Sequence, residues 1–132
     1  MIMQETFAFS ASHTLPTFHD GHKCRACHGH LWRVTIEIRV DTGEQGYAFD
    51  HADLDLVALE AIKPLDHKHL NDIAGLERGL AEDVLAWLVP RVGAAVERRG
   101  GSLLGLDLSE GSSGATLREV WHIKRWRLIE GS

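Results

Sequence analysis

The run from Lys23 to His30, Lys-Cys-Arg-Ala-Cys-His-Gly-His, places two thiols and two imidazoles within a short stretch of chain. Thiolates act as nucleophiles, proton acceptors and metal ligands, while imidazoles ligate zinc or move protons. Eight of the nine histidines lie between His13 and His69, and no run of consecutive histidines marks an expression tag. This clustering indicates chemistry that is local to one region of the chain.

Residues 31–40, which follow this run, alternate apolar and polar side chains as a half-buried strand does. Because side chains two apart in a strand share a face, His28 and His30 extend the apolar face of this strand. A second alternating segment ends at His13, on the face that carries Phe7, Phe9 and Ala11. Antiparallel pairing of the two segments would bring His13 near His28 and His30. Three imidazoles with water in the fourth position are typical of a catalytic zinc site.

The two cysteines leave an alternative open for the same run. With His28 and His30, Cys24 and Cys27 form a two-cysteine, two-histidine set that would suit a structural zinc knuckle. That set requires the adjacent Cys27 and His28 to ligate one ion, which is sterically awkward, so the three-histidine site is favoured. Redox catalysis is disfavoured, because the cysteine pair leads into an antiparallel-type strand rather than a βαβ unit.

The bulk properties are those of an ordinary globular chain. It has 132 residues, of which 44% are hydrophobic and 25% charged, and we expect a single domain over residues 1–132. The net charge is −5 and no basic patch is present, so no nucleic-acid partner is expected. The sequence shows neither a signal-peptide pattern nor an apolar run long enough for a bilayer, which predicts a cytoplasmic protein without a membrane partner.

The spacing of apolar residues, together with the residues that begin and end helices and strands, predicts six main elements. Strands are expected over about residues 4–13, 28–40, 103–108 and 116–129, and helices over about residues 52–62 and from Leu80 to residue 98. Asp50 is expected to cap the first helix, and Pro90 to kink or split the second. The order ββααββ predicts an α+β fold, a four-stranded antiparallel sheet with two helices on one face.

Three motifs resemble the 6-pyruvoyl-tetrahydropterin synthase family, which includes 6-carboxy-tetrahydropterin synthase. They are the Phe-Ser-Ala-Ser-His stretch ending at His13, the Lys-Cys-x-x-x-His-Gly-His run ending at His30, and the Leu-Asp-His-x-x-Leu-Asn segment that starts at Leu65. The motifs follow the family's order, and the resemblance covers about residues 7–115. It implies the tunnelling fold (T-fold), and a homo-oligomer, a trimer or a hexamer, in which sheet edges pair between subunits.

The resemblance also implies roles for single residues. His13, His28 and His30 would ligate Zn²⁺. Cys24 matches the catalytic cysteine, and Asp66 with His67 would relay protons with it. Glu110 matches the glutamate that binds the pterin, and we expect it to lie outside the metal site. The implied reaction is that of a zinc-dependent lyase of the queuosine route, converting 7,8-dihydroneopterin triphosphate to 6-carboxy-5,6,7,8-tetrahydropterin, acetaldehyde and triphosphate.

Other activities stay open at this point. They are 6-pyruvoyl-tetrahydropterin formation, cleavage of dihydroneopterin by a related dihydropterin aldolase, and zinc-bearing pterin binding without turnover. The chain departs from the family pattern with Gly79-Leu80 in place of a Pro-Thr pair, Gly111 after Glu110, Thr14 after the first histidine and His51 after Asp50. These departures border the expected pocket, so they bear on the substrate more than on fold or metal.

Overall fold

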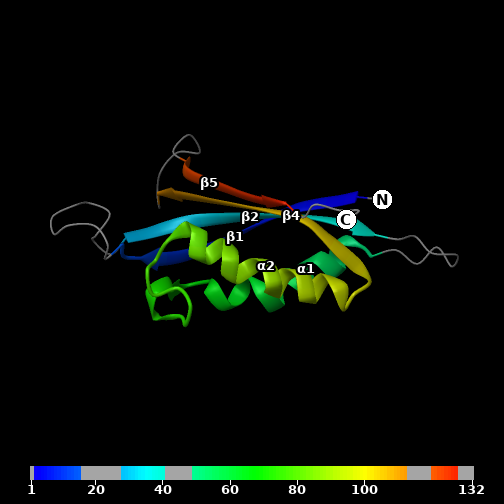
Figure 1. Ribbon diagram of the computed structural model, residues 1–132, viewed down its shortest axis with the longest axis horizontal. Helices are drawn as coiled ribbons and strands as arrows, with labels where there is room; N and C mark the ends of the chain where they lie inside the picture. Colours follow the sequence, from blue (N-terminus) through cyan, green and yellow to red (C-terminus); the bar gives the residue numbers. More distant parts are fainter. Residues whose placement is uncertain (1, 16–27, 41–48, 113–119, 128–132) are drawn as a thin grey trace, which may run out of the picture.

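The computed structural model describes residues 2–15, 28–40, 49–112 and 120–127, with the backbone alone at residues 28, 111, 112 and 120–127. The sheet contains β1 (Ile2–His13), β2 (His28–Val40), β3 (Lys68–His69), β4 (Gly101–Ser112) and β5 (Val120–Arg127), in the spatial order β3-β1-β2-β4-β5. Helices α1 (His51–Ala61) and α2 (Ala81–Glu97) cover one face of it (Figure 1). Two short 3-10 turns, η1 (Lys63–Leu65) and η2 (Leu70–Asp72), flank β3.

The predicted α+β architecture is confirmed, with two helices on one face of a sheet whose long strands are antiparallel to their neighbours. The prediction of a purely antiparallel sheet is wrong in one element, because β3 pairs in parallel with β1 and Ser12 lies opposite His69. A two-residue strand carries no alternation that a sequence could reveal. In the part of the chain described, no helix has the length and hydropathy needed to span a membrane.

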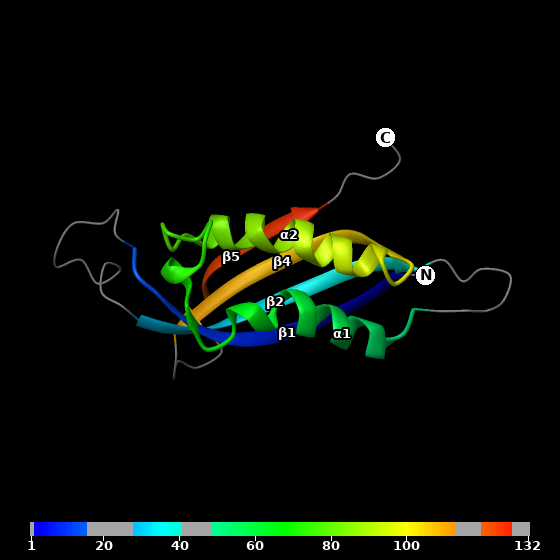
Figure 2. The same ribbon diagram turned by 90° about the horizontal axis from the view of Figure 1, so that it is seen from below.

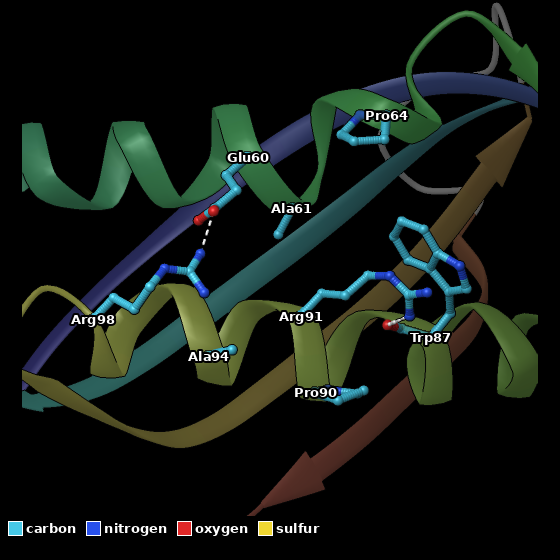
Figure 3. Close-up of a pocket in the computed structure, with 8 residues that line it drawn as sticks. All are labelled: Glu60, Ala61, Pro64, Trp87, Pro90, Arg91, Ala94 and Arg98. Atoms are coloured by element: carbon cyan, nitrogen blue, oxygen red, sulfur yellow. Dashed lines mark hydrogen bonds and ion pairs between the residues drawn. The ribbon is translucent and has the colours of Figure 1, made fainter.

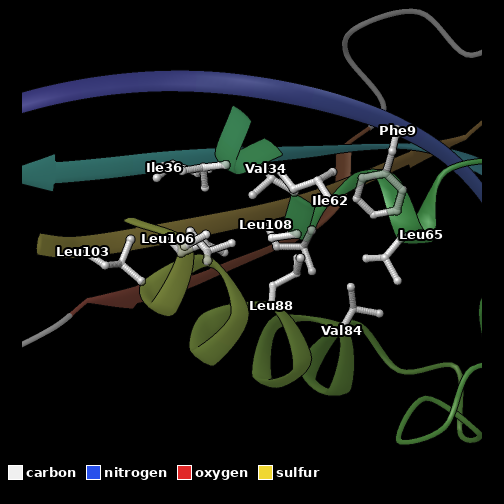
Figure 4. Packing of buried hydrophobic residues seen from close by; sticks show 14 of the residues in the cluster. Phe9, Val34, Ile36, Ile62, Leu65, Val84, Leu88, Leu103, Leu106 and Leu108 are labelled. Carbon is white, nitrogen blue, oxygen red and sulfur yellow. The ribbon is translucent and has the colours of Figure 1, made fainter. Parts of the chain in front are cut away.

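The alternation along the strands produces the core on the helix side of the sheet. β2 buries five consecutive even-numbered side chains there, Trp32, Val34, Ile36, Ile38 and Val40. Figure 2 shows the two helices side by side in front of the sheet, with α2 along β4. Val84 and Leu88 of α2 pack into the same hydrophobic cluster as Leu106 and Leu108 of β4 (Figure 4).

A bulge in β4 decides which of its side chains face the core. Glu37 pairs with Gly105 but the next residue, Ile38, pairs with Leu103, so Leu104 is the extra residue. Beyond the bulge the even-numbered side chains are buried, and these include Glu110. The strand predicted to end at residue 108 continues to residue 112. Glu110 is therefore a strand residue on the core face rather than a turn residue.

The helix signals behave largely as predicted. Asp50 caps α1 in a capping box, accepting a hydrogen bond from Asp53 N–H while the Asp53 carboxylate accepts one from Asp50 N–H. Gly100, with φ of 91°, follows the end of α2, where a glycine commonly ends a helix. Pro90 was predicted to kink or split the second helix, and the split does not occur, because α2 runs unbroken from residue 81 to residue 97. The buried stripe of this helix outweighs the one backbone hydrogen bond that a proline removes.

Asp50→Ala should lower the free energy of unfolding by about 1 kcal/mol, because it removes one half of the capping box and leaves an N–H of the first turn without its side-chain acceptor. Urea unfolding at a fixed protein concentration measures the change. Asp55→Ala is the control, since Asp55 lies exposed within the same helix. Equal losses in the two variants would contradict a role for the cap.

Candidate active site

The side chains of His13, His30 and Glu110 meet on the helix side of the sheet, where β1 ends, β2 begins and β4 ends. Their potential ligand atoms all lie within 4.8 Å of one another. His13 Nε2 and Glu110 Oε2 are 3.9 Å apart. All three residues are buried, with no more than 6% of their surface exposed. The register creates this group, because Ala11 lies opposite His30 and Trp32 lies opposite Glu110.

Trp32 forms the base of the group. Its indole meets the His13 ring edge-to-face with centroids 5.2 Å apart, and the His30 ring in the same way at 5.8 Å. The indole N–H donates a hydrogen bond to Ala11 O at 3.2 Å, which fixes the ring between β1 and β2. The two imidazoles are themselves edge-to-face, 4.8 Å between centroids. Packing against one immobile indole therefore holds both histidines in orientation.

His13 is oriented further by a hydrogen bond of 2.7 Å between its Nδ1 and Gly79 O. A carbonyl oxygen only accepts, so Nδ1 carries a proton, and Nε2, which carries the lone pair when the ring is neutral, faces Glu110. Metal-ligating histidines typically donate their second N–H in this way. Two buried imidazoles beside a carboxylate, with one tautomer fixed, form a donor set that fits zinc.

The Gly79 departure has a structural reason. Its φ is 69°, a region that favours glycine, and a Cβ at this position would lie 2.3 Å from Thr14 O. Asn71 holds the same stretch of backbone, accepting a hydrogen bond from Thr14 N–H and donating one to Thr14 O. Gly79 thus lets the segment before α2 approach the end of β1, where it meets His13.

The other predicted metal residues are placed only in part. The backbone of His28 lies opposite His13 in the β1–β2 pair, as the predicted pairing requires. Its side chain, Cys24 and Cys27 lie outside the residues described. Glu110, expected to lie apart from the metal ligands, instead lies beside His13.

Asp66 and His67 form a second polar group at the edge of the sheet. His67 Nδ1 lies 2.9 Å from the Asp66 carboxylate, and Asp66 Oδ1 accepts a hydrogen bond of 2.9 Å from Ser10 N–H. His67 also donates its own backbone N–H to Ser10 O. Its φ of 59° is unusual for a residue with a side chain, and the imidazole is 81% exposed. Asp66 thus anchors the imidazole at a fixed place while its far nitrogen faces outward.

One cavity of about 530 Å³ joins the two groups, since both His30 and His67 line it. Its remaining lining comes from β1, β2 and β3: Ser10, Ala11, Ser12, Gly29, Leu31, Lys68 and His69. Within it, His69 Nδ1 lies 2.9 Å from Ser12 Oγ. The parallel pairing that brings His69 beside Ser12 has no local signal in the sequence, so the sequence alone assigns His69 no role.

A groove of about 560 Å³ lies between α1 and α2, away from the histidines (Figure 3). Arg91 stacks over the ring of Trp87, 3.8 Å from its centroid, and Arg98 pairs with Glu60 across the two helices. The first contact lies within α2, and the Arg98–Glu60 pair joins the two helices to each other. The groove is therefore part of the helix–helix seam and contributes no group to the candidate site.

Two of the remaining family departures also have structural places. His51 lies exposed at the first position of α1, with its Nδ1 3.2 Å from Glu5 Oε2. Gly111 follows a register shift between β4 and β5. Neither residue is part of the group formed by His13, His30 and Glu110.

Gly79→Ala should weaken zinc binding by about 10- to 100-fold although it changes no ligand, because the added Cβ displaces the carbonyl that orients His13. Competition with a chromophoric chelator measures the dissociation constant. Gly100→Ala is the matched control, since Gly100 also has a positive φ but a Cβ there would meet nothing within 4 Å. The control should lose stability but keep its zinc affinity; equal zinc affinity in both variants would contradict the proposed orientation of His13.

The pKa of Asp66 supplies a test of the polar group that Asp66 and His67 form at the edge of the sheet. The hydrogen bond from Ser10 N–H lowers the pKa of this carboxyl below 3.8, and His67 and Lys63 act in the same direction. The resulting stability is present above the ordinary pKa and is lost as pH falls through the lower, folded value. Between about pH 6 and pH 3, the free energy of unfolding should therefore fall less in Asp66→Asn than in wild type. The difference between the two should stay under about 1 kcal/mol, because Asp66 and His67 lie near the surface. Urea unfolding measures this, with Asp55→Asn expected to follow wild type.

Comparison with known proteins identifies relatives of this chain. The family model for 6-pyruvoyl tetrahydropterin synthase matches residues 2–119. The 6-carboxy-5,6,7,8-tetrahydropterin synthase of Synechocystis sp. is 37% identical over 97 residues, which cover 69% of this chain and 74% of the relative. A putative 6-carboxy-5,6,7,8-tetrahydropterin synthase of Archaeoglobus fulgidus is 37% identical over 73 residues, 54% of this chain and 60% of the relative.

Solved structures agree on the fold. The 6-pyruvoyl tetrahydropterin synthase of Caenorhabditis elegans superposes with a TM-score of 0.73 at 19% identity, covering 98% of this chain and 96% of that one. The family model matches this chain over most of its length. The same chain has the strand order described above, two helices on one face of the sheet, and histidines at the end of β1 and the start of β2. The chain belongs to the 6-pyruvoyl tetrahydropterin synthase family.

Proposed function

We propose that the protein is a zinc-dependent lyase that converts 7,8-dihydroneopterin triphosphate, with uptake of water, to 6-carboxy-5,6,7,8-tetrahydropterin, acetaldehyde and triphosphate. The observation that carries this choice within the family is the 37% identity to the Synechocystis relative of that name. The compact Lys-Cys-x-x-x-His-Gly-His run from Lys23 to His30 supports the same choice. The product would feed the queuosine and 7-deazapurine route.

The metal ligands in this proposal are His13, His28 and His30. The buried position of His13 and His30, and the hydrogen bond from His13 Nδ1 to Gly79 O, support two of them directly. His28 is supported by its backbone position opposite His13. When bound, zinc supplies a Lewis acid that holds the hydroxyl groups of the substrate's side chain and acidifies the adjoining C–H bonds.

Cys24, Asp66 and His67 would move the protons. Cys24 stands four residues before His28 in the sequence and would accept a proton from the substrate's side chain. Asp66 fixes His67 through its Nδ1, so Nε2 of that ring is the atom that exchanges a proton with the substrate. The shared cavity that His67 and His30 line supports their action on one substrate.

Glu110 would recognise the pterin ring. A carboxylate accepts two parallel hydrogen bonds from the 2-amino group and the adjacent ring N–H of a pterin. Its buried position on β4, within 4.8 Å of the imidazole donors, supports a ring held beside the metal.

We further propose a single domain that assembles as a homo-oligomer, a trimer or a hexamer, in the cytoplasm, with no nucleic-acid or membrane partner. The net charge of −5 argues against a nucleic-acid partner. The edges of the sheet argue for assembly, because exposed strand edges are paired or covered in stable proteins.

The proposal is tested by incubating the zinc-loaded protein with 7,8-dihydroneopterin triphosphate and identifying products by mass spectrometry. Acetaldehyde together with 6-carboxytetrahydropterin is the expected result. A 6-pyruvoyl product without acetaldehyde would identify the protein as a pyruvoyl synthase instead. Cleavage of unphosphorylated dihydroneopterin alone would identify an aldolase, and binding of biopterin without any turnover would identify a pterin-binding protein.

Cys24→Ala should abolish this turnover and leave zinc content unchanged, because the thiol accepts a proton and does not hold the metal. Cys27→Ala is the control and should stay active. Zinc content is measured by atomic absorption and turnover by acetaldehyde release. If both cysteine variants lost zinc while His13→Ala retained it, the two-cysteine, two-histidine knuckle would be the correct site.

A further inference from the structure

We propose that Asn71 is a positioning residue for the metal site: by holding the backbone around Gly79 against the end of β1, it sets the direction of the His13 imidazole. The inference deepens the proposed function and rests on its metal site at His13 and His30. Asn71 acts through the backbone that it holds and is not itself a ligand. It belongs to η2, far along the chain from β1, so spacing in the sequence gives no indication of this role.

The side-chain amide of Asn71 joins two separate pieces of backbone. Its Oδ1 accepts a hydrogen bond of 2.9 Å from Thr14 N–H, and its Nδ2 donates one of 2.8 Å to Thr14 O. Nδ2 also donates to Glu77 O at 3.0 Å. Only an amide offers an acceptor and two donors at this length, so an aspartate here would lose two of the three hydrogen bonds and an alanine all three.

These hydrogen bonds determine where the Gly79 carbonyl lies. Thr14 follows His13 directly at the end of β1, and Glu77 precedes Gly79 by two residues. The two pieces of backbone are in close contact, since a Cβ on Gly79 would lie 2.3 Å from Thr14 O and 3.0 Å from Asn71 Nδ2. Gly79 O in turn accepts the 2.7 Å hydrogen bond from His13 Nδ1. A shift of this backbone away from β1 would therefore move the acceptor that orients the imidazole.

The segment that ends at Asn71 lies along the edge of β1 that faces away from β2. At its start Asp66 accepts the N–H of Ser10, in its middle β3 pairs with β1, and at its end Asn71 pairs with Thr14. The two polar side chains thus extend the short pairing of β3 in both directions. Because each end has its own hydrogen bonds, loss of Asn71 should release the end beside His13 and leave the end at Asp66 in place.

Zinc affinity of the full chain without substrate, measured by competition with a chromophoric chelator, tests the inference. Asn71→Ala should bind zinc about tenfold more weakly than wild type, the lower end of the loss expected when an outer partner of a metal ligand is removed. Asp50→Ala is the matched control, because it also removes a side-chain hydrogen bond to backbone, at the start of α1. It should lose stability but keep wild-type zinc affinity.

The absorption spectrum of the Co²⁺-substituted protein reports ligand geometry separately from affinity. It should differ from wild type in Asn71→Ala and in Asn71→Asp, and it should be unchanged in Asp50→Ala. Asn71→Asp keeps the shape of the side chain and the acceptor for Thr14 N–H, so it serves if the alanine variant does not fold. Asn71→Ala combined with Gly79→Ala should bind zinc within about twofold of Gly79→Ala alone, because both substitutions act on one carbonyl.

An unchanged zinc affinity in Asn71→Ala, or an unchanged Co²⁺ spectrum in whichever Asn71 variant folds, would overturn the inference. Equal losses of zinc affinity in Asn71→Ala and Asp50→Ala would overturn it too, because they would trace the effect to stability alone. Full additivity of Asn71→Ala and Gly79→Ala would show that the two residues act separately, which rules out the route through the carbonyl.

These outcomes are separate from the product assay. If wild type forms the expected products while Asn71→Ala keeps its zinc affinity, the inference fails and the proposed function stands. If zinc binding depends on Asn71 but wild type forms no product, the proposed function fails and the inference stands.

Discussion

The pairing register of β1 with β2 is the constraint on which the candidate site depends. It sets His13 opposite His28 and Ala11 opposite His30, and it also stacks Phe9 against Trp32 with ring centroids 5.9 Å apart. A slip of one residue would turn the buried side chains of either strand to the opposite face. Burial of the apolar side chains opposes such a slip, and it therefore also fixes the direction of the imidazoles. The core thus holds the donor atoms in place before any ion binds.

Sequence reasoning located most of the fold because the main elements carry strong local signals. β2 was predicted at its observed bounds from strict alternation, and α1 from the Asp50 cap. Features set by distant packing gave no such signal. The parallel strand β3 exists only because the chain after η1 docks on β1, and the bulge at Leu104 reflects how β4 fits against β2. Both depend on tertiary contacts that periodicity cannot encode.

The candidate site likewise has one part that the sequence predicts and another that only the folded structure shows. The direction of His13 and His30 follows from strand alternation, and the structure confirms that they share the core face. The same alternation, continued past Leu106 and Leu108, would also have placed Glu110 on the core face. It was not continued, because the strand was predicted to end at residue 108. The bond from His13 to Gly79 joins residues 66 apart, and only the folded chain shows it. The roles of Cys24 and His67 rest on resemblance, because spacing alone does not identify a proton acceptor.

The backbone of His67 has a consequence for how this chain diverges over time. With φ of 59°, an imidazole-bearing residue occupies a conformation that costs roughly 1 kcal/mol or more compared with glycine or asparagine. Drift under selection for stability alone would replace His67 with one of those two residues. The contact of His67 Nδ1 with the Asp66 carboxylate, 2.9 Å away, is an interaction that a glycine there would lose. Gene copies that keep the fold but lose the chemistry should therefore reveal themselves first at this position, before the buried histidines change.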